Sequence, residues 1–98
     1  MSESKIKRDI CDWLNANGFY TVLNVVTNQN GLADVTVYCP GGRVFLIETK
    51  QPGKNYSKLQ QYRQEELFKK VQVKTFRADS LKTVKKIVTD GEFLSDKG

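Results

Sequence analysis

The sequence predicts an α/β fold in which a mixed β-sheet is flanked by helices. Apolar residues recur at helical spacing at the start of the chain, after residue 57 and after residue 80. Between them, β-branched and aromatic residues are concentrated in short runs that are typical of strands. The order is therefore helix, three strands, helix, strand, helix. A three-strand meander followed by a crossover helix and a further strand gives a mixed sheet with helices packed on its faces.

The first helix is predicted from about Glu3 to Asn17, where apolar side chains form one stripe. Glu3 lies three residues before Ile6 and seven before Ile10, so we expect it to extend this buried stripe. An acid in the first turn of a helix can also serve only to favour the helix dipole. A strand from Phe19 to Val26 follows.

Two further strands are predicted to form a hairpin. The segment from Leu32 to Tyr38 and the run from Val44 to Ile47 both have the composition of strands. Pro40-Gly41-Gly42 lies between them and is a strong turn signal. The two strands should therefore pair as neighbours, with alternate side chains on opposite faces.

A crossover helix is predicted from Ser57 to about Lys70. Ser57 and Gln60 have the spacing of a capping box. Gln60 shares a helix face with Gln64 and Leu67, so its side chain should turn toward the sheet. The fold is completed by a strand from about Gln72 to Phe76 and a helix from Ser80 to Val88.

The length of 98 residues corresponds to a single domain. We expect this domain to span residues 1–90 and residues 91–98 to form a loose C-terminal tail.

The most informative pattern is Asp34 followed, thirteen residues later, by Glu48-Thr49-Lys50. Side chains alternate along a strand, so Glu48 and Lys50 should point to one face, and Asp34 joins them if the hairpin pairs in register. Two carboxylates beside an ammonium group suit a divalent metal ion that holds a phosphodiester, because Mg²⁺ prefers oxygen ligands and offsets phosphate charge. The pattern therefore indicates a metal-dependent phosphodiesterase site.

This pattern resembles the PD-(D/E)XK nuclease signature, with Asp34 as the first acid and Glu48-Thr49-Lys50 as the E-x-K element. Gly31-Leu32-Ala33-Asp34, Ile47-Glu48-Thr49-Lys50, the helix bearing Gln60 and the early glutamate Glu3 are similar to the motifs of the virus-type replication-repair nuclease (VRR-NUC) family. The resemblance runs from about Glu3 to the strand around Val73. Ala33 departs from the family pattern, in which proline is usual, but proline there shapes the backbone and supplies no chemistry.

The resemblance implies a restriction-endonuclease-like PD-(D/E)XK core with the order α-β-β-β-α-β-α. It implies that Asp34, Glu48 and the main-chain carbonyl of Thr49 hold one or two Mg²⁺ or Mn²⁺ ions. Lys50 would orient or help to deprotonate the attacking water and stabilise the charge developing at phosphorus. Glu3 would be a further metal-site or water-positioning acid, and Gln60 would complete the site. The implied reaction is hydrolysis of DNA to a 5′-phosphate and a 3′-hydroxyl.

Each of these residues also has an ordinary structural interpretation. Asp34 can cap or solvate a strand end, and Gln60 can be a capping or surface residue. Glu48 can form a structural ion pair with Lys50 or Arg43, because a carboxylate at the end of a buried strand is costly unless it is paired or metal bound.

Composition narrows the function further. The chain has 16 Lys and Arg against 11 Asp and Glu, a net charge of +5, which favours a polyanionic partner. It contains no histidine, which excludes Ser-His-Asp hydrolysis and metal sites with histidine ligands. The longest apolar run is only Val44 to Ile47, so we expect no membrane span and no signal peptide. We therefore expect a soluble, intracellular protein, in the cytoplasm of a bacterial or phage-infected cell.

We expect DNA as the partner, branched or junction DNA in particular. Small members of this superfamily that resemble junction resolvases act as twofold dimers, which implies a homodimer with one site per strand. A flap-specific or exonucleolytic enzyme is an alternative, and so is a catalytically inert nucleic-acid-binding module. The basic residues of the second half are either a solvated face or contacts to DNA: Lys54, Lys58, Arg63, Lys69 and Lys70.

Overall fold

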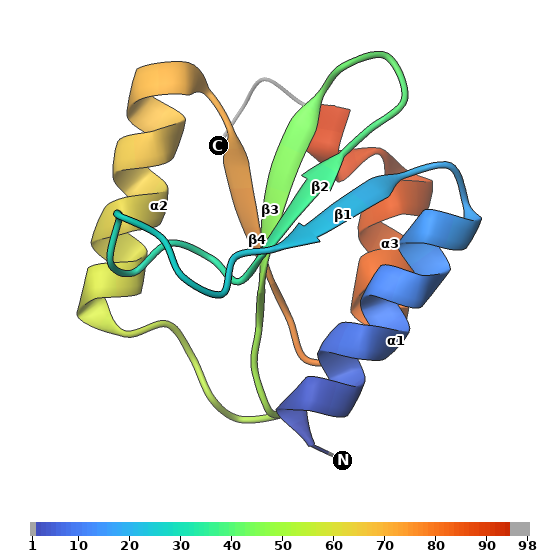
Figure 1. Ribbon diagram of the computed structural model, residues 1–98, viewed down its shortest axis with the longest axis horizontal. Helices are drawn as coiled ribbons and strands as arrows, with labels where there is room; N and C mark the ends of the chain where they lie inside the picture. Colours follow the sequence, from blue (N-terminus) through green and yellow to red (C-terminus); the bar gives the residue numbers. More distant parts are fainter. Residues whose placement is uncertain (1, 95–98) are drawn as a thin grey trace.

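The computed structural model describes residues 2–94 and has the predicted order of elements (Figure 1). Helix α1 is followed by strands β1, β2 and β3, helix α2, strand β4, helix α3 and a short 3₁₀ helix, η1. Their bounds are α1 Glu3–Ala16, β1 Tyr20–Leu23, β2 Val35–Tyr38, β3 Val44–Thr49, α2 Lys58–Val71, β4 Lys74–Ala78, α3 Leu81–Asp90 and η1 Glu92–Leu94.

The four strands form one mixed sheet in the order β1-β2-β3-β4. β1, β2 and β3 are antiparallel neighbours, and β4 runs parallel to β3 because α2 carries the chain back across the sheet. Helix α2 lies on one face of the sheet, and α1 and α3 lie together on the other (Figure 1). No helix in the described part of the chain is long and apolar enough to cross a membrane.

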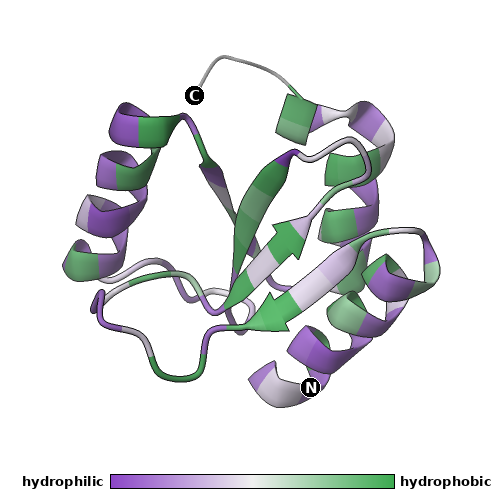
Figure 2. Cartoon of the chain, turned by 45° about the horizontal axis from the view of Figure 1, so that its top comes forward, coloured by the Kyte–Doolittle hydropathy of each residue, from purple (hydrophilic) through white to green (hydrophobic). Residues whose placement is uncertain are grey.

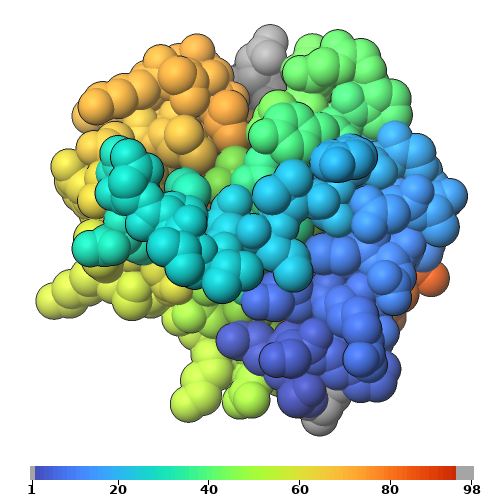
Figure 3. All heavy atoms as spheres, in the orientation of Figure 1, coloured from blue at the N-terminus to red at the C-terminus, as the bar shows by residue number. Residues whose placement is uncertain are grey.

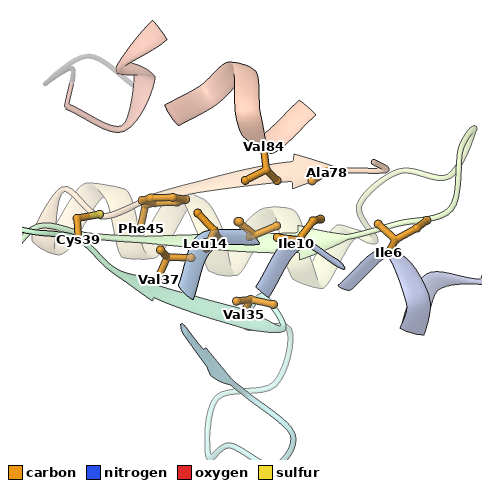
Figure 4. Packing of buried hydrophobic residues seen from close by; sticks show 10 residues of the cluster. Ile6, Ile10, Leu14, Val35, Val37, Cys39, Phe45, Ala78 and Val84 are labelled. Atoms are coloured by element: carbon orange, nitrogen blue, oxygen red, sulfur yellow. The ribbon is translucent and has the colours of Figure 1, made fainter. Parts of the chain in front are cut away.

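The main core lies between the sheet and the pair α1 and α3 (Figure 4). α1 contributes its predicted stripe of Ile6, Ile10 and Leu14, because residues three and four apart share a helix face. The strands contribute alternate residues, as the pleat requires. These inward residues include Val35, Val37, Phe45 and Ile47.

The strands differ from their predicted bounds: β2 begins at Val35 and not at Leu32, β3 continues to Thr49, and β1 and β4 also differ. β1 ends at Leu23, not Val26, because the Asn24 side-chain amide donates to Ala33 O (2.9 Å) and Thr36 Oγ1 (2.8 Å) where the chain leaves the sheet. β4 begins at Lys74, two residues later than expected. Gln72 adopts a left-handed conformation (φ 57°) that closes α2 before the strand can start.

Part of the predicted tail is packed. The Phe93 ring lies 5.3 Å from the Phe45 ring and 5.9 Å from the Phe19 ring, centroid to centroid, so η1 covers one end of the core. Residues 91–94 thus contact the core through their single phenylalanine, and the expectation of a loose tail stays a prediction. The remaining residues of the predicted tail, 95–98, lie outside the described residues.

Glu3 also differs from expectation, because it is exposed and does not extend the buried stripe. The first turn of α1 runs past the ends of β1 and β2, where no strand remains to cover it (Figure 1). Ile6 is the first buried residue of α1, and helical periodicity therefore continues before it to a position that has no packing partner.

The loop between β1 and β2 packs against α2 at Gly31. Figure 3 shows this loop in cyan, spanning the surface between the α2 side and the α1 side. Gly31 has φ +84°, and a Cβ at this position would lie 2.7 Å from Leu59 Cγ and 2.9 Å from the Leu59 carbonyl oxygen. Arg63 Nε donates to Asn30 O at 2.9 Å and holds the same contact. A glycine is required here both by conformation and by space.

Replacing Gly31 by alanine should lower the free energy of unfolding by about 2–4 kcal/mol, the sum of a left-handed alanine and an overpacked contact. Gly41→Ala is the matched control. Its φ is +88°, but nothing lies within 4 Å of the added Cβ, so only the conformational cost of about 1–2 kcal/mol applies. Urea unfolding of both variants measures the difference, and equal losses would contradict the proposed contact with α2.

Candidate active site

The β2–β3 hairpin places Asp34 opposite Glu48. Val35 pairs with Ile47, and continuing this antiparallel register by one residue brings the two acids together at the same end of the sheet. Asn24 N–H donates to Asp34 O at 2.8 Å, which continues the β1–β2 ladder as far as Asp34. The register predicted from the sequence is therefore the observed one.

The Asp34 carboxylate is fixed by Thr49. Asp34 Oδ1 accepts a hydrogen bond from the Thr49 N–H at 3.1 Å, and Oδ2 accepts one from the Thr49 hydroxyl at 2.5 Å. Lys7 Nζ lies 3.7 Å from Asp34 Oδ2. Thr49, on the other side of β3 from Glu48, thus ties the two neighbouring strand ends together through one carboxylate.

The Glu48 carboxylate is buried, with 7% of the residue exposed. Its Oε2 accepts a hydrogen bond from Gln60 Nε2 at 2.9 Å and lies 3.6 Å from Lys50 Nζ. Burial raises the pKa of Glu48, and the charge of Asp34 raises it further, whereas Lys50 lowers it. The ionised form of Glu48 is therefore energetically unfavourable in this site, and a bound cation would stabilise it.

Gln60 joins helix α2 to this acid. The predicted capping box is present: Ser57 Oγ accepts from the Gln60 N–H at 3.1 Å, and Gln60 Oε1 accepts from the Ser57 N–H at 2.9 Å. The other end of the same amide donates to Glu48. Gln60 turns toward the sheet as predicted, and it serves as a cap and as a partner of the acid together.

A small pocket opens beside Glu48 and Gln60. Its volume is about 10 Å³, room for about one water molecule, and its walls include Gly31, Tyr56 and Leu67. Burial, with a contribution from the Glu48 charge, raises the pKa of Tyr56 to about 12. The phenol therefore stays protonated at neutral pH and can donate a hydrogen bond in the pocket.

The segment after Lys50 has no regular structure, as expected, but Arg77 holds it in place. Arg77 Nε donates to the Lys54 carbonyl at 2.7 Å, and a second guanidinium nitrogen reaches the Gln51 carbonyl at 3.4 Å. Arg77 also pairs with Asp79 at 3.1 Å. One arginine on β4 thus positions the basic loop beside the acids.

Most of the predicted site residues lie together. Asp34, Glu48, Thr49, Lys50 and Gln60 form one continuous set of contacts at the end of β3. Glu3 is not part of it: within residues 2–94 it makes no hydrogen bond or ion pair through its side chain, and its role stays a prediction. No group of three or more acids or cysteines is arranged to hold a metal in the same range.

Sequence reasoning missed Lys7, Tyr56 and Arg77. Lys7 follows a buried isoleucine on α1 and had no signal beyond its charge, and Arg77 lies in a strand whose start was placed two residues early. Tyr56 precedes the capping serine of α2 and could have been noticed as an aromatic residue beside a motif. All three depend on contacts between segments distant in sequence.

The donor set suits Mg²⁺ or Mn²⁺. Two carboxylates are the usual protein contribution to a Mg²⁺ site, where waters and substrate phosphates supply the other ligands. Each carboxylate oxygen can accept two bonds, so Asp34 can keep its bonds to Thr49 and still bind a cation.

Comparison with known proteins supports the fold. No model of a protein family and no curated protein matches the sequence. The fold is similar to that of a solved structure described as a VRR_NUC domain, with a TM-score of 0.75 over 89% of this chain and 94% of that chain. The two sequences are 23% identical, so the likeness concerns the fold. It confirms the predicted fold class, a mixed sheet flanked by helices with the element order α-β-β-β-α-β-α.

The raised pKa of Glu48 predicts a pH-dependent stability. In the range just above the ordinary glutamate pKa, the folded protein binds more protons than the unfolded chain, so its stability falls as pH rises through this range. Glu48→Gln stays neutral at every pH. In buffer with EDTA, the free energy of unfolding of this variant relative to the parent should rise as pH increases above the ordinary glutamate pKa, and level off once Glu48 of the parent is ionised in the folded state.

Glu66→Gln is the matched control with the opposite sign. The hydrogen bond from Arg63 lowers the pKa of the partly exposed Glu66, so this carboxylate stabilises the protein above its ordinary pKa and loses that effect as pH falls. The Glu66 variant should therefore lose stability relative to the parent as pH rises. The free energies of unfolding are measured by urea titration at each pH. If they changed with pH in the same direction for both variants, burial would not raise the pKa of Glu48.

Proposed function

We propose that this protein is a Mg²⁺- or Mn²⁺-dependent deoxyribonuclease that hydrolyses phosphodiester bonds. One observation carries the proposal: Asp34 and Glu48 lie opposite each other at one end of the sheet, with Lys50 Nζ 3.6 Å from Glu48. The similarity in fold to a VRR_NUC domain supports it. The net charge of +5 suits a polyanionic substrate.

Asp34, Glu48 and the Thr49 main-chain carbonyl are the groups that would hold the cation. When bound, Mg²⁺ or Mn²⁺ supplies Lewis-acid activation of the phosphodiester and of a water molecule. Lys50 extends from the same strand end toward Glu48, where its ammonium group can orient the attacking water and stabilise negative charge at phosphorus. Hydrolysis would leave a 5′-phosphate and a 3′-hydroxyl.

Gln60 and Thr49 keep the two acids in position for this reaction. Gln60 fixes the Glu48 carboxylate from α2, and Thr49 fixes Asp34 from β3. Hydrogen bonds from neighbouring residues to metal-binding side chains orient those side chains and tune their affinity for the metal. Exposed Lys54, within the loop between Lys50 and α2, and exposed Lys58, the first residue of α2, can contact the DNA backbone without reading sequence.

Asp34→Asn, Glu48→Gln and Lys50→Met should each lower the rate of DNA cleavage by about 10²-fold or more, because each removes charge at the reacting phosphate. Cleavage of labelled DNA with Mg²⁺ or Mn²⁺ measures this effect, with EDTA expected to stop it. Asp9→Asn and Glu66→Gln remove partly exposed acids that pair with Lys5 and Arg63, and they should cleave at the parent rate.

Folded Asp34 and Glu48 variants that cut as fast as the parent would refute the site. A parent protein that binds DNA but fails to cut it with either metal would instead support the alternative of an inert nucleic-acid-binding module.

We further propose that the protein acts as a homodimer on branched DNA such as a four-way junction. Helix α2 lies over β4, so the part of its sheet face formed by β1 and β2 is uncovered. Figure 2 shows hydrophobic colouring on this edge and in the loop that follows β1. Exposed apolar side chains on this face and in the loop that follows β1 form what we call the β1–β2 patch: Tyr20, Val22, Val25, Val26 and Tyr38. Patches of this kind mark interaction sites, and β1 is also a free sheet edge.

A charge placed in the β1–β2 patch should dissociate the dimer. Val22→Arg is expected to convert a particle of twice 11.2 kDa into one of 11.2 kDa in light scattering, and to reduce paired incision of a junction more than cleavage of plain duplex. Val71→Arg, at an apolar residue 55% exposed on α2, is the control. A monomeric parent that prefers a flap or a free end would favour the flap-specific or exonucleolytic alternative.

A further inference from the structure

Helix α1 brings a second lysine to the acids. Lys7 Nζ lies 3.7 Å from Asp34 Oδ2, and the Lys7 side chain is 31% exposed. In the proposed mechanism Lys50 orients water and stabilises charge at phosphorus, and Lys7 has no role. Each acid therefore has its own cation: Lys50, from the end of β3, serves Glu48, and Lys7, from the helix on the opposite side of the sheet, serves Asp34.

The surroundings of Cys11 agree with this placement. Cys11 lies one helical turn after Lys7. Burial is the main cause that raises the pKa of the Cys11 thiol, and the charges of Asp34 and Lys7 also act on it, in opposite directions. Asp34 and Lys7 thus both lie near the same face of α1.

The contact between Lys7 and Asp34 is easy to exchange. A separation of 3.7 Å is too long for a hydrogen bond, and Asp34 Oδ2 already accepts the hydroxyl of Thr49. A partly exposed ion pair of this type contributes little to stability. Lysine carries its charge on a flexible four-carbon chain, so the ammonium group can reach another anion without movement of α1.

We propose that Lys7 is a substrate-positioning residue that neutralises Asp34 in the metal-free protein and transfers to a DNA phosphate when a divalent cation binds. This inference rests on the proposed function. A cation on Asp34 repels the ammonium group, and the incoming backbone offers it a new negative partner. Lys7 therefore competes with the metal and assists the DNA.

These opposite effects separate the proposal from a structural ion pair. Loss of the Lys7 charge should tighten metal binding, because a competitor is removed, and should weaken DNA binding only when a metal is present. A lysine that merely stabilised α1 would change neither affinity. A lysine on a general basic surface would weaken DNA binding equally with and without metal.

The test uses Lys7→Gln, with Lys7→Arg as a charge-retaining variant and Lys5→Gln as the matched control. Lys5 lies on the same helix and pairs with exposed Asp9 at 2.8 Å. Calorimetric titration with Mn²⁺, without DNA, should give roughly two- to tenfold tighter binding for Lys7→Gln and parent-like binding for Lys5→Gln, the range expected for loss of a partly exposed ion pair near a dication.

DNA affinity is then measured with a fluorescent duplex in EDTA and in Ca²⁺, a cation that also takes oxygen ligands. In Ca²⁺ the Lys7→Gln variant should bind about three- to tenfold more weakly, with a salt slope smaller by about one, and Lys7→Arg should restore both. In EDTA the variant and the parent should bind alike.

Unchanged Mn²⁺ affinity in Lys7→Gln, or a loss of DNA affinity that is equal in EDTA and Ca²⁺, would overturn the role of Lys7. In either case the Asp34 and Glu48 variants can still abolish metal binding and cleavage, so the proposed nuclease function would stand. A parent protein that binds no Mn²⁺ would overturn both.

Discussion

The structure depends on how a carboxylate is accommodated at the buried end of β3. Glu48 follows a strand whose neighbours pack in the core, where an isolated charge would be costly. Gln60 and Lys50 reduce this cost without removing it, and the raised pKa of Glu48 reflects what remains. Because Gln60 belongs to α2, the helix must sit over this strand end, and the pocket beside Glu48 follows from that position.

Sheet topology then determines which groups can meet this acid. The antiparallel hairpin brings Asp34 opposite Glu48, and the parallel return of β4 places Arg77 beside the loop that leaves the site. α1 approaches the same strand ends from the other face and contributes Lys7. Lys7 from α1 and Lys50 from the end of β3 thus place one cation beside each carboxylate, although the main hydrophobic core lies between the sheet and the α1 and α3 helices.

The sequence predicted those features that arise from local patterns. The hairpin register followed from alternation and a turn, the capping box identified the start of α2, and the helix face that Gln60 shares with Leu67 predicted its inward direction. Contacts that join separate elements could not be predicted in the same way. A lysine on a helix looks the same in sequence whether it faces water or Asp34, and Phe93 gave no periodic signal of the packing that it makes with Phe45. The burial predicted for Glu3 was wrong because helical periodicity does not reveal where the sheet beneath a helix ends.

Gln60 uses both atoms of its side-chain amide, so glutamate cannot replace it without losing one of the two contacts. In most capping boxes glutamate and glutamine are interchangeable, because only an accepting oxygen is required. Here the oxygen accepts from Ser57 and the nitrogen donates to Glu48. A glutamate would keep the cap but would bring a second carboxylate against Glu48, beside a pocket with room for one water molecule. In other helices this substitution has little effect. Here it would force either protonation of one of the two carboxylates or fraying of the first turn of α2.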